Sequence, residues 1–291
     1  MKIGLFAPWI SSYATPAFLA EAAQHAERLG FHSIWVPEHV LLFDEYASSY
    51  PYTQDGRIKV GQEPNILEPF NYLSFMAAAT STIRLGTGIC LVPQRHPVYT
   101  AKEVATVDYL SNGRVDFGVG IGWLKEEFEA LGVSWPRRGQ RTRDYIELMQ
   151  RLWYDPVSEY DGEFYTLPPS RQYPKPVQQP HPPVHFGGES DAALRRVADI
   201  GQGWYGFGLS PEDATERIGT LTRLLEERGR SRADVHISVS PRFGPFDTST
   251  VPAYRETGAD QLILTGYGRS PDDYFESLKT LRAEAVEVAA G

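Results

Sequence analysis

The stretch Ile83-Arg84-Leu85-Gly86-Thr87-Gly88-Ile89-Cys90-Leu91-Val92-Pro93 is the best guide to the fold of this chain. Apolar residues are dense in it, and two glycines, Gly86 and Gly88, lie inside the run. This pattern predicts a strand over 83–92 that is buried on both faces and closely approached near its C-terminal end. The close approach is compatible with a flat ligand ring on bare backbone and equally with a tight corner of the core.

The segments before this stretch alternate between strand and helix. Residues 3–9 predict a first strand, and residues 16–29 predict a helix that Thr15 caps, Pro16 begins and Gly30 ends. Residues 33–37 predict a second strand. Because two strands joined by a helix need a crossover connection, we expect them to be parallel neighbours.

The same alternation continues to the end of the chain. Further strands are expected at 83–92, 114–120, 184–187, 203–206, 236–240 and 260–265, and further helices at 70–80, 98–110, 139–153, 191–200, 211–228, 252–257 and 271–283. Eight strands, each followed by a helix, predict a (β/α)8 TIM barrel forming one domain over 1–291. A doubly wound sheet is disfavoured, because Ser11-Ser12-Tyr13-Ala14 replaces the glycine-rich turn expected after its first strand.

Two long segments interrupt the alternation. Residues 38–68, after the second strand, are aromatic and polar, and the part at 43–64 is typical of a lid over a binding site. Residues 154–183, before the fifth strand, are proline-rich, with a small hairpin predicted around Asp161-Gly162. We therefore expect the barrel to carry insertions at these two places.

Composition narrows the classes of partner. The 291 residues carry a net charge of −9, and no run rich in Lys or Arg occurs, which argues against nucleic acid and membrane surfaces as partners. The chain begins directly with a strand pattern and has no apolar run long enough for a bilayer, so a cytoplasmic location is expected. The single cysteine, Cys90, excludes an intramolecular disulfide and is expected to be a buried apolar residue.

Active sites of such barrels lie at the C-terminal ends of the strands. After the second strand the sequence offers Glu38-His39, an imidazole next to a carboxylate that could raise its basicity. A purely structural, hydrogen-bonded role for His39 is equally compatible with its position. No metal site is expected, because two prolines separate His181 from His185 and no HExxH motif occurs.

Glycines mark several other strand ends. Gly187-Gly188-Glu189-Ser190 stands between a strand and a helix, where backbone N–H groups, the helix dipole and the Ser190 hydroxyl can hold a phosphate. Ser190 could also be only the N-cap of that helix. Gly120-x-Gly122 resembles half of a nucleotide-binding loop. Strand ends rich in glycine and aromatic residues, and poor in carboxylate pairs, favour a large flat ligand over hydrolytic chemistry.

Taken together, these stretches resemble the luciferase-like monooxygenase superfamily of flavin- and deazaflavin-dependent barrels. The resemblance rests on Trp-Val-Pro-Glu-His at 35–39, on segments 84–89, 96–114, 118–123 and 126–132, and on Gly-Gly-Glu-Ser at 187–190. It covers most of the first 200 residues. It implies a non-proline cis peptide at Gly88-Ile89, against which the cofactor ring would rest.

The resemblance also implies roles for individual residues. His39 would be catalytic, Glu38 would lie beside the cofactor ring, and Trp9 and Trp123 would contact the ring or the substrate. Trp123 stands where sugar-phosphate dehydrogenases of the deazaflavin branch carry an acid, which argues against the same substrate. The residues implied to bind the cofactor phosphate are Gly187, Gly188 and Ser190, with backbone support from Gly120 and Gly122.

The activity implied is hydride transfer between C5 of coenzyme F420 and a small organic substrate. The signature at 35–39 and the compact length resemble the F420-dependent group, so F420 is the favoured cofactor and FMN the alternative. An FMNH2-dependent monooxygenase that uses O2, a non-catalytic flavin-binding relative, and a barrel whose glycines serve only packing are the competing hypotheses. The resemblance further implies a homodimer formed through helices of the first half.

Overall fold

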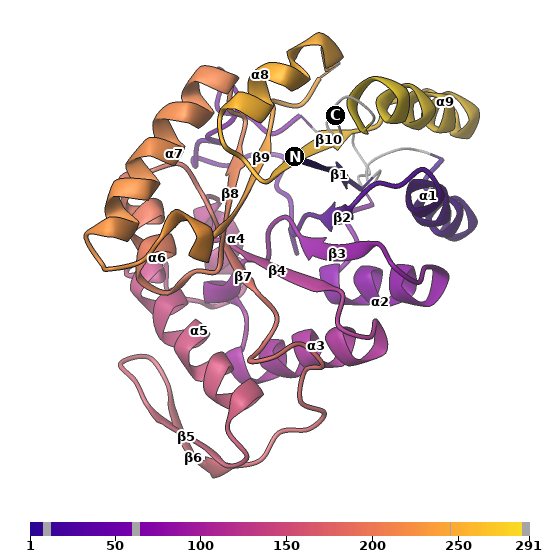
Figure 1. Cartoon of the computed structure of the whole chain (residues 1–291). Coiled ribbons are helices and arrows are strands. Elements are labelled where there is room, and N and C mark those ends of the chain that lie inside the picture. Colours follow the sequence, from indigo (N-terminus) through magenta and orange to yellow (C-terminus); the bar gives the residue numbers. More distant parts are fainter. Residues whose placement is uncertain (8–12, 60–64, 245, 287–291) are drawn as a thin grey trace.

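The fold is a closed barrel of parallel strands surrounded by helices, seen in a computed structural model that describes residues 1–7, 13–59, 65–244 and 246–286 (Figure 1). The strands follow the order β1-β10-β9-β8-β7-β4-β3-β2, and β1 closes the barrel by pairing with both β10 and β2. Their bounds are β1 Lys2–Phe6, β2 Ser33–Val36, β3 Arg84–Thr87, β4 Val115–Val119, β7 Val184–Gly187, β8 Gly203–Phe207, β9 His236–Ser240 and β10 Gln261–Thr265. The predicted TIM barrel is confirmed.

Helices follow the strands and cover the outside of the barrel (Figure 1). Their bounds are α1 Pro16–Arg28, α2 Pro69–Ala79, α3 Pro97–Leu110, α4 Lys125–Ala130, α5 Arg138–Tyr154, α6 Asp191–Ile200, α7 Pro211–Glu226, α8 Val251–Glu256 and α9 Pro271–Leu281. Short 3-10 turns occupy Val92–Gln94, Arg232–Asp234 and Thr248–Thr250, and a π-helical turn, Arg282–Val286, follows α9. No described helix is long and apolar enough to cross a membrane.

Local sequence explains where these helices begin. Thr15 caps α1 by accepting the N–H of Phe18, and Ser210 forms a capping box with Asp213 at the start of α7. Proline at the first helical position, as at Pro16, has no N–H to leave unpaired. The predicted helix bounds are therefore close to the observed ones, whereas α4, which is six residues long, was not predicted.

The predicted third strand is shorter than expected. The prediction of a strand over 83–92 is wrong beyond Thr87, because β3 ends there and the chain turns at Gly88. Cys90 keeps only an isolated bridge to Val119. A Cβ at Gly86 would lie 2.5 Å from the Trp35 ring, so the close approach at Gly86 is made by a core side chain.

The two insertions lie where the sequence placed them. Between β2 and α2, the described residues form neither helix nor strand. Between α5 and β7, β5 Ser158–Asp161 and β6 Thr166–Ser170 pair antiparallel, which confirms the predicted hairpin. The hairpin extends outside the barrel beyond α5 (Figure 1).

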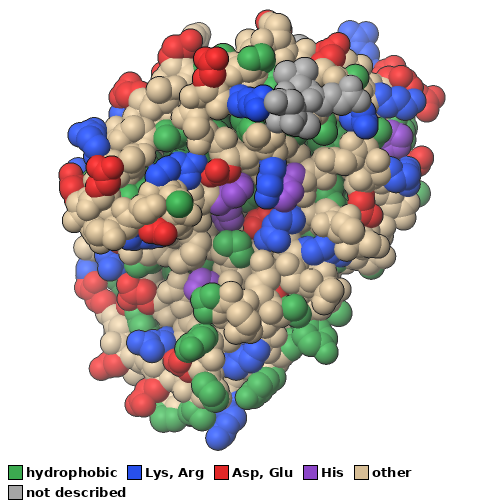
Figure 2. All heavy atoms as spheres, in the orientation of Figure 1, with side chains coloured by type: hydrophobic (Ala, Val, Ile, Leu, Met, Phe, Trp, Pro, Cys, Tyr) green, Lys and Arg blue, Asp and Glu red, His purple; other side chains and the backbone are tan. Residues whose placement is uncertain are grey.

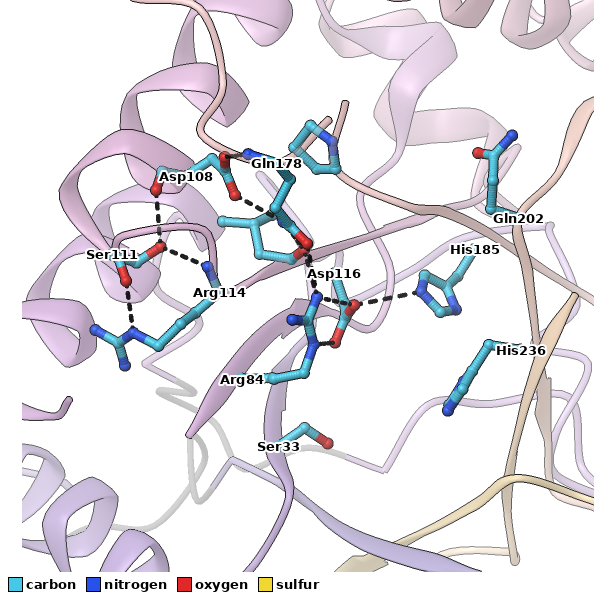
Figure 3. A network of polar contacts seen from close by, with 12 residues as sticks. Ser33, Arg84, Asp108, Ser111, Arg114, Asp116, Gln178, His185, Gln202 and His236 are labelled. Atoms are coloured by element: carbon cyan, nitrogen blue, oxygen red, sulfur yellow. Dashed lines mark hydrogen bonds and ion pairs between the residues drawn. The ribbon is translucent and has the colours of Figure 1, made fainter. Parts of the chain in front are cut away.

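The N-terminal end of the barrel interior is closed by a polar network (Figure 3). Arg84 binds Asp116 through both carboxylate oxygens, at 2.6 and 2.7 Å, and the buried His185 lies 3.5 Å from the same carboxylate. These residues are at or near the starts of β3, β4 and β7. Because active sites of such barrels lie at the opposite end, this network is structural.

Candidate active site

The C-terminal ends of the strands gather most of the residues singled out in the sequence. His39 follows β2, Gly88 and Ile89 follow β3, Gly120 begins the segment after β4, and Gly187 ends β7. Parallel strands place these positions at one end of the barrel, which we call the mouth. Trp9 and residues 60–64 of the predicted lid lie outside the described residues.

The Gly88-Ile89 peptide bond is cis, as the resemblance implied. Its turn directs the Ile89 side chain across the neighbouring strand ends. A Cβ at Gly120 would overlap Ile89, and one at Gly187 would lie 2.7 Å from Ile89 Cδ1. Glycine at positions 120 and 187 is therefore explained by packing, because any side chain there would collide with Ile89.

The segment after β7 has the geometry of a helix entry. Gly188 has a φ of +104°, a conformation that L side chains rarely adopt. The exposed Ser190 is the N-cap of α6, where its side chain accepts the N–H of Ala193 at 3.3 Å. The N-cap role left open by the sequence is therefore present, and the N-terminus of α6 is at the mouth.

His39 is held from two sides. Its Nδ1 lies 3.2 Å from Oε2 of Glu127, and its Nε2 lies 3.3 Å from the indole nitrogen of Trp123. The imidazole is 10% exposed and the Glu127 side chain 0% exposed. His39 and Trp123 are therefore in direct contact, although 84 positions separate them in the sequence.

The carboxylate that accompanies His39 is Glu127, and the expectation that Glu38 would do so does not fit the geometry. Glu38 is buried, accepts the N–H of Leu91 and forms an ion pair with Arg95. Burial raises the pKa of Glu38, and Arg95 and the Leu91 N–H oppose that rise. Glu38 therefore fastens the segment after β3.

Glu127 was not recognised in the sequence as a site residue. It belongs to α4, and its other oxygen, Oε1, accepts the N–H groups of Val40 and Leu41 at 2.6 and 3.1 Å. Burial would raise the pKa of Glu127, but His39 and these N–H groups together lower it. The group is thus an anion at neutral pH. The only sequence signal was its place in the segment 126–132 that carries the family resemblance.

The described part of the predicted lid, residues 43–59, is held on two sides of the mouth by hydrogen bonds to carboxylates. Oε1 of Glu126 accepts the N–H groups of Ala47 and Ser48 at 2.6 and 3.1 Å. Farther along, the Tyr52 hydroxyl donates to Oε2 of Glu189 at 3.2 Å. The segment is therefore anchored at α4 and, on the other side of the mouth, just after β7.

Aromatic rings line the underside of this segment. Tyr46 and Tyr50 meet the Trp123 ring edge-on, with centroids 5.6 and 5.0 Å apart. Tyr52 meets Phe207 in the same way at 4.7 Å. A cavity of about 1260 Å³ opens beside His39, and its lining includes residues 39–47.

The described residues contain no group of three His, Cys, Asp or Glu side chains arranged for a metal ion.

Comparison with known proteins identifies the family. The luciferase-like monooxygenase family matches residues 1–251. An uncharacterised protein of Mycobacterium tuberculosis is 33% identical over 272 residues, which cover 91% of this chain and 93% of the relative. The chain therefore belongs to the luciferase-like monooxygenases, a family of oxidoreductases.

Two further relatives differ in cofactor. The F420-dependent glucose-6-phosphate dehydrogenase of Microbacterium testaceum is 31% identical over 216 residues, covering 72% of this chain and 59% of that enzyme. The oxygenase component of the flavin-dependent trigonelline monooxygenase of Acinetobacter baylyi is 34% identical over 168 residues, covering 57% and 41%. The family therefore includes relatives of both cofactor types.

Solved structures agree on the fold. The coenzyme F420-dependent tetrahydromethanopterin reductase of Methanopyrus kandleri superposes with a TM-score of 0.76, at 17% identity over 99% of both chains. A monooxygenase of Streptomyces bottropensis gives 0.77 at 20% identity, again over 99% of both chains. At these identities the likeness concerns the barrel itself.

Proposed function

We propose that this protein is an F420-dependent oxidoreductase that transfers a hydride between C5 of the deazaflavin and a small organic substrate at the mouth. The observation that carries the proposal is the arrangement of His39 between Glu127 and Trp123, at the same end of the barrel as the Gly88-Ile89 turn. Bound F420 would supply the carbon that accepts or donates the hydride. His39 would accept or return the proton that accompanies it.

The residues at the mouth fit such a cofactor. The cis turn and the Ile89 side chain present an apolar surface to a flat ring, and the N-terminus of α6 offers backbone N–H groups to a phosphate. Gly188 and Ser190 are the residues that we assign to the phosphate, and Gly120, Gly122 and Gly187 keep the backbone around it free of side chains.

Two arginines add positive charge beside this region. Arg138, the first residue of α5, donates its Nε–H to the carbonyl of Gly122 at 3.3 Å. Arg196 of α6 lies close by, with Nη1 3.3 Å from the position that a Cβ on Gly139 would take. Burial, and then the charge of Arg138, lower the pKa of Arg196. Two neighbouring cations of like charge are stabilised by an anionic ligand such as a cofactor phosphate.

F420 is preferred over FMN because the F420-dependent relative matches a larger share of this chain than the flavin-dependent one. Titration of the protein with F420 and with FMN, separately and by fluorescence, tests the preference. We expect F420 to bind with a micromolar or lower Kd. Micromolar FMN binding without F420 binding would overturn the choice and favour an FMNH2-dependent monooxygenase.

Catalysis itself is tested at His39. His39→Ala should lower kcat by about 100-fold or more, the usual contribution of a general acid or base. If His39→Ala turns over substrate as fast as the wild type, His39 is not catalytic, and the hypothesis of a flavin-binding relative without chemistry at this residue gains support.

We also propose that the protein is a homodimer. Several large side chains of α2 and α3 are exposed, among them Phe75, Tyr99, Tyr109 and Leu110. Figure 2 shows hydrophobic side chains gathered at the end of the molecule where α3, α5 and the hairpin lie. Light scattering at two concentrations should give twice the chain mass, and Tyr99→Glu should give monomers.

A further inference from the structure

Glu127 uses both carboxylate oxygens to hold the segment that carries His39. Oε1 accepts the N–H groups of Val40 and Leu41, and Oε2 faces His39 Nδ1 at 3.2 Å. The side chain is completely buried. All of these contacts of Glu127 are to residues 39–41, so this carboxylate holds that loop and the His39 side chain in place.

The two contacts of His39 select one protonation state of its ring. An ionised carboxylate only accepts hydrogen bonds, so Nδ1 must carry a proton toward Glu127. The indole nitrogen of Trp123 only donates, so Nε2 must present its lone pair. The neutral ring protonated at Nδ1 satisfies both neighbours, whereas the tautomer protonated at Nε2 satisfies neither.

We propose that Glu127 is a positioning residue that fixes His39 in the Nδ1-protonated tautomer, so that Nε2 is the proton acceptor at the mouth. A substrate group that donates a proton takes the place of the Trp123 N–H at Nε2. Glu127 itself exchanges no proton with the substrate. The catalytic importance of Glu127 rests on the function proposed above, whereas its effect on the His39 tautomer does not.

The residue before it provides a matched comparison. Glu126 stands on the same turn of α4 and also accepts two backbone N–H groups of the segment after β2, those of Ala47 and Ser48. No contact joins Glu126 to His39 in the described structure. Comparing the two residues therefore separates the hold on the loop from the effect on the imidazole.

Glu127→Gln is the decisive variant. Its carbonyl oxygen can still accept the N–H groups of Val40 and Leu41, which leaves the amide NH2 toward His39. Because this group donates, it favours an accepting Nδ1 and a proton on Nε2, against the single Trp123 N–H that favours the opposite tautomer. The nitrogen at the mouth then no longer accepts a proton.

The test is 15N NMR of histidine-labelled protein without cofactor, with the His39 signals assigned by their loss in His39→Gln. We expect the neutral His39 ring to carry its proton on Nδ1 in the wild type and in Glu126→Gln, and on Nε2 in Glu127→Gln. In Trp123→Phe, which keeps the Glu127 carboxylate, His39 should remain protonated at Nδ1. This variant is the substitute test if Glu127→Gln does not fold. An unchanged tautomer in folded Glu127→Gln, or a changed one in Trp123→Phe, would refute the proposal.

Turnover supplies the second readout. With a substrate in hand, Glu127→Gln should lower kcat by about 100-fold, with KM changing far less, since the proton acceptor is lost while the loop is still held. If wild type shows no turnover with F420, the proposed function fails, but the NMR result still decides the role of Glu127. If Glu127→Gln changes the His39 tautomer but keeps the kcat of the wild type, Glu127 positions His39, but this positioning does not contribute to catalysis.

Discussion

Tyr52 and Glu189 join the two sides of the mouth by one hydrogen bond of 3.2 Å, although 137 positions separate them in the sequence. The other oxygen of Glu189 accepts the N–H of Phe207, so the carboxylate is fixed before it meets the lid. Burial raises the pKa of Glu189, and the Phe207 N–H and the Tyr52 hydroxyl oppose that rise. Tyr52 thus joins the segment after β2, through Glu189, to the end of β8.

Removing this fastening should weaken ligand binding. Tyr52→Phe deletes one hydrogen bond, a loss of about 1 kcal/mol, and should raise the KM of the substrate by about 5-fold with little change in kcat. Tyr154→Phe, at an exposed position on α5, is the control. Steady-state kinetics measure both, and an unchanged KM in Tyr52→Phe would show that the lid does not limit binding.

Packing of Ile89 can be tested at Gly120. Gly120→Ala places a methyl group on Ile89, and overpacking of this kind costs about 1–3 kcal/mol. We expect lower stability in denaturant unfolding together with weaker cofactor binding. Adding Ile89→Ala should recover part of the stability. Gly219→Ala, in the middle of α7 with open space around it, should instead stabilise the fold by about 1 kcal/mol.

The arginine pair predicts the salt dependence of cofactor binding. Arg196→Ala should weaken binding by about 10-fold and reduce its dependence on ionic strength, because a partly buried cation near the proposed phosphate site is lost. Arg195→Ala changes the neighbouring, exposed arginine of the same helix and should have little effect. Equal losses in the two variants would show that only overall charge matters.

The polar network at the N-terminal end predicts how stability depends on pH. Burial, followed by the charge of His185, lowers the pKa of His236 to about 4. A histidine with a lowered folded pKa binds its proton more readily in the unfolded chain. Stability from this group is therefore complete above about pH 6.5 and is lost as the pH falls toward 4.

Thermal unfolding between pH 7 and 4 measures this loss. We expect the melting temperature to fall over the interval in the wild type and to fall less in His236→Gln. Asp116, whose pKa is lowered by His185 and Arg84 against the effect of burial, adds a loss only at still lower pH. Parallel curves for the two proteins would contradict the assignment to His236.

The barrel was predictable from the sequence because its signals are local. Capping residues and apolar periodicity mark each unit, as at Thr15 and Ser210. The cis peptide at Gly88-Ile89 was implied only by the resemblance of segment 84–89 to the family, and the local pattern alone predicted a continuous strand there.

The site was harder to predict because its contacts are distant in sequence. His39 and Glu127 are 88 positions apart, and α4 is too short for its periodicity to be visible. Glu38 precedes His39 in the sequence, but its carboxylate binds Leu91 and Arg95, because side chains of adjacent residues in an extended chain point to opposite sides. Gly120 and Gly187 fit a phosphate loop in sequence, but only the path of Ile89 reveals that they also accommodate a side chain.

The neighbouring carboxylates of α4 have a consequence for the order of events. Glu126 binds the segment after β2 at Ala47 and Ser48, while Glu127 binds the same segment at Val40 and Leu41 and contacts His39. A shift of this single turn would therefore loosen the segment after β2 and misplace the imidazole at the same time. Under the function proposed above, the covering of the mouth and the orientation of the imidazole would then depend on the same turn of α4.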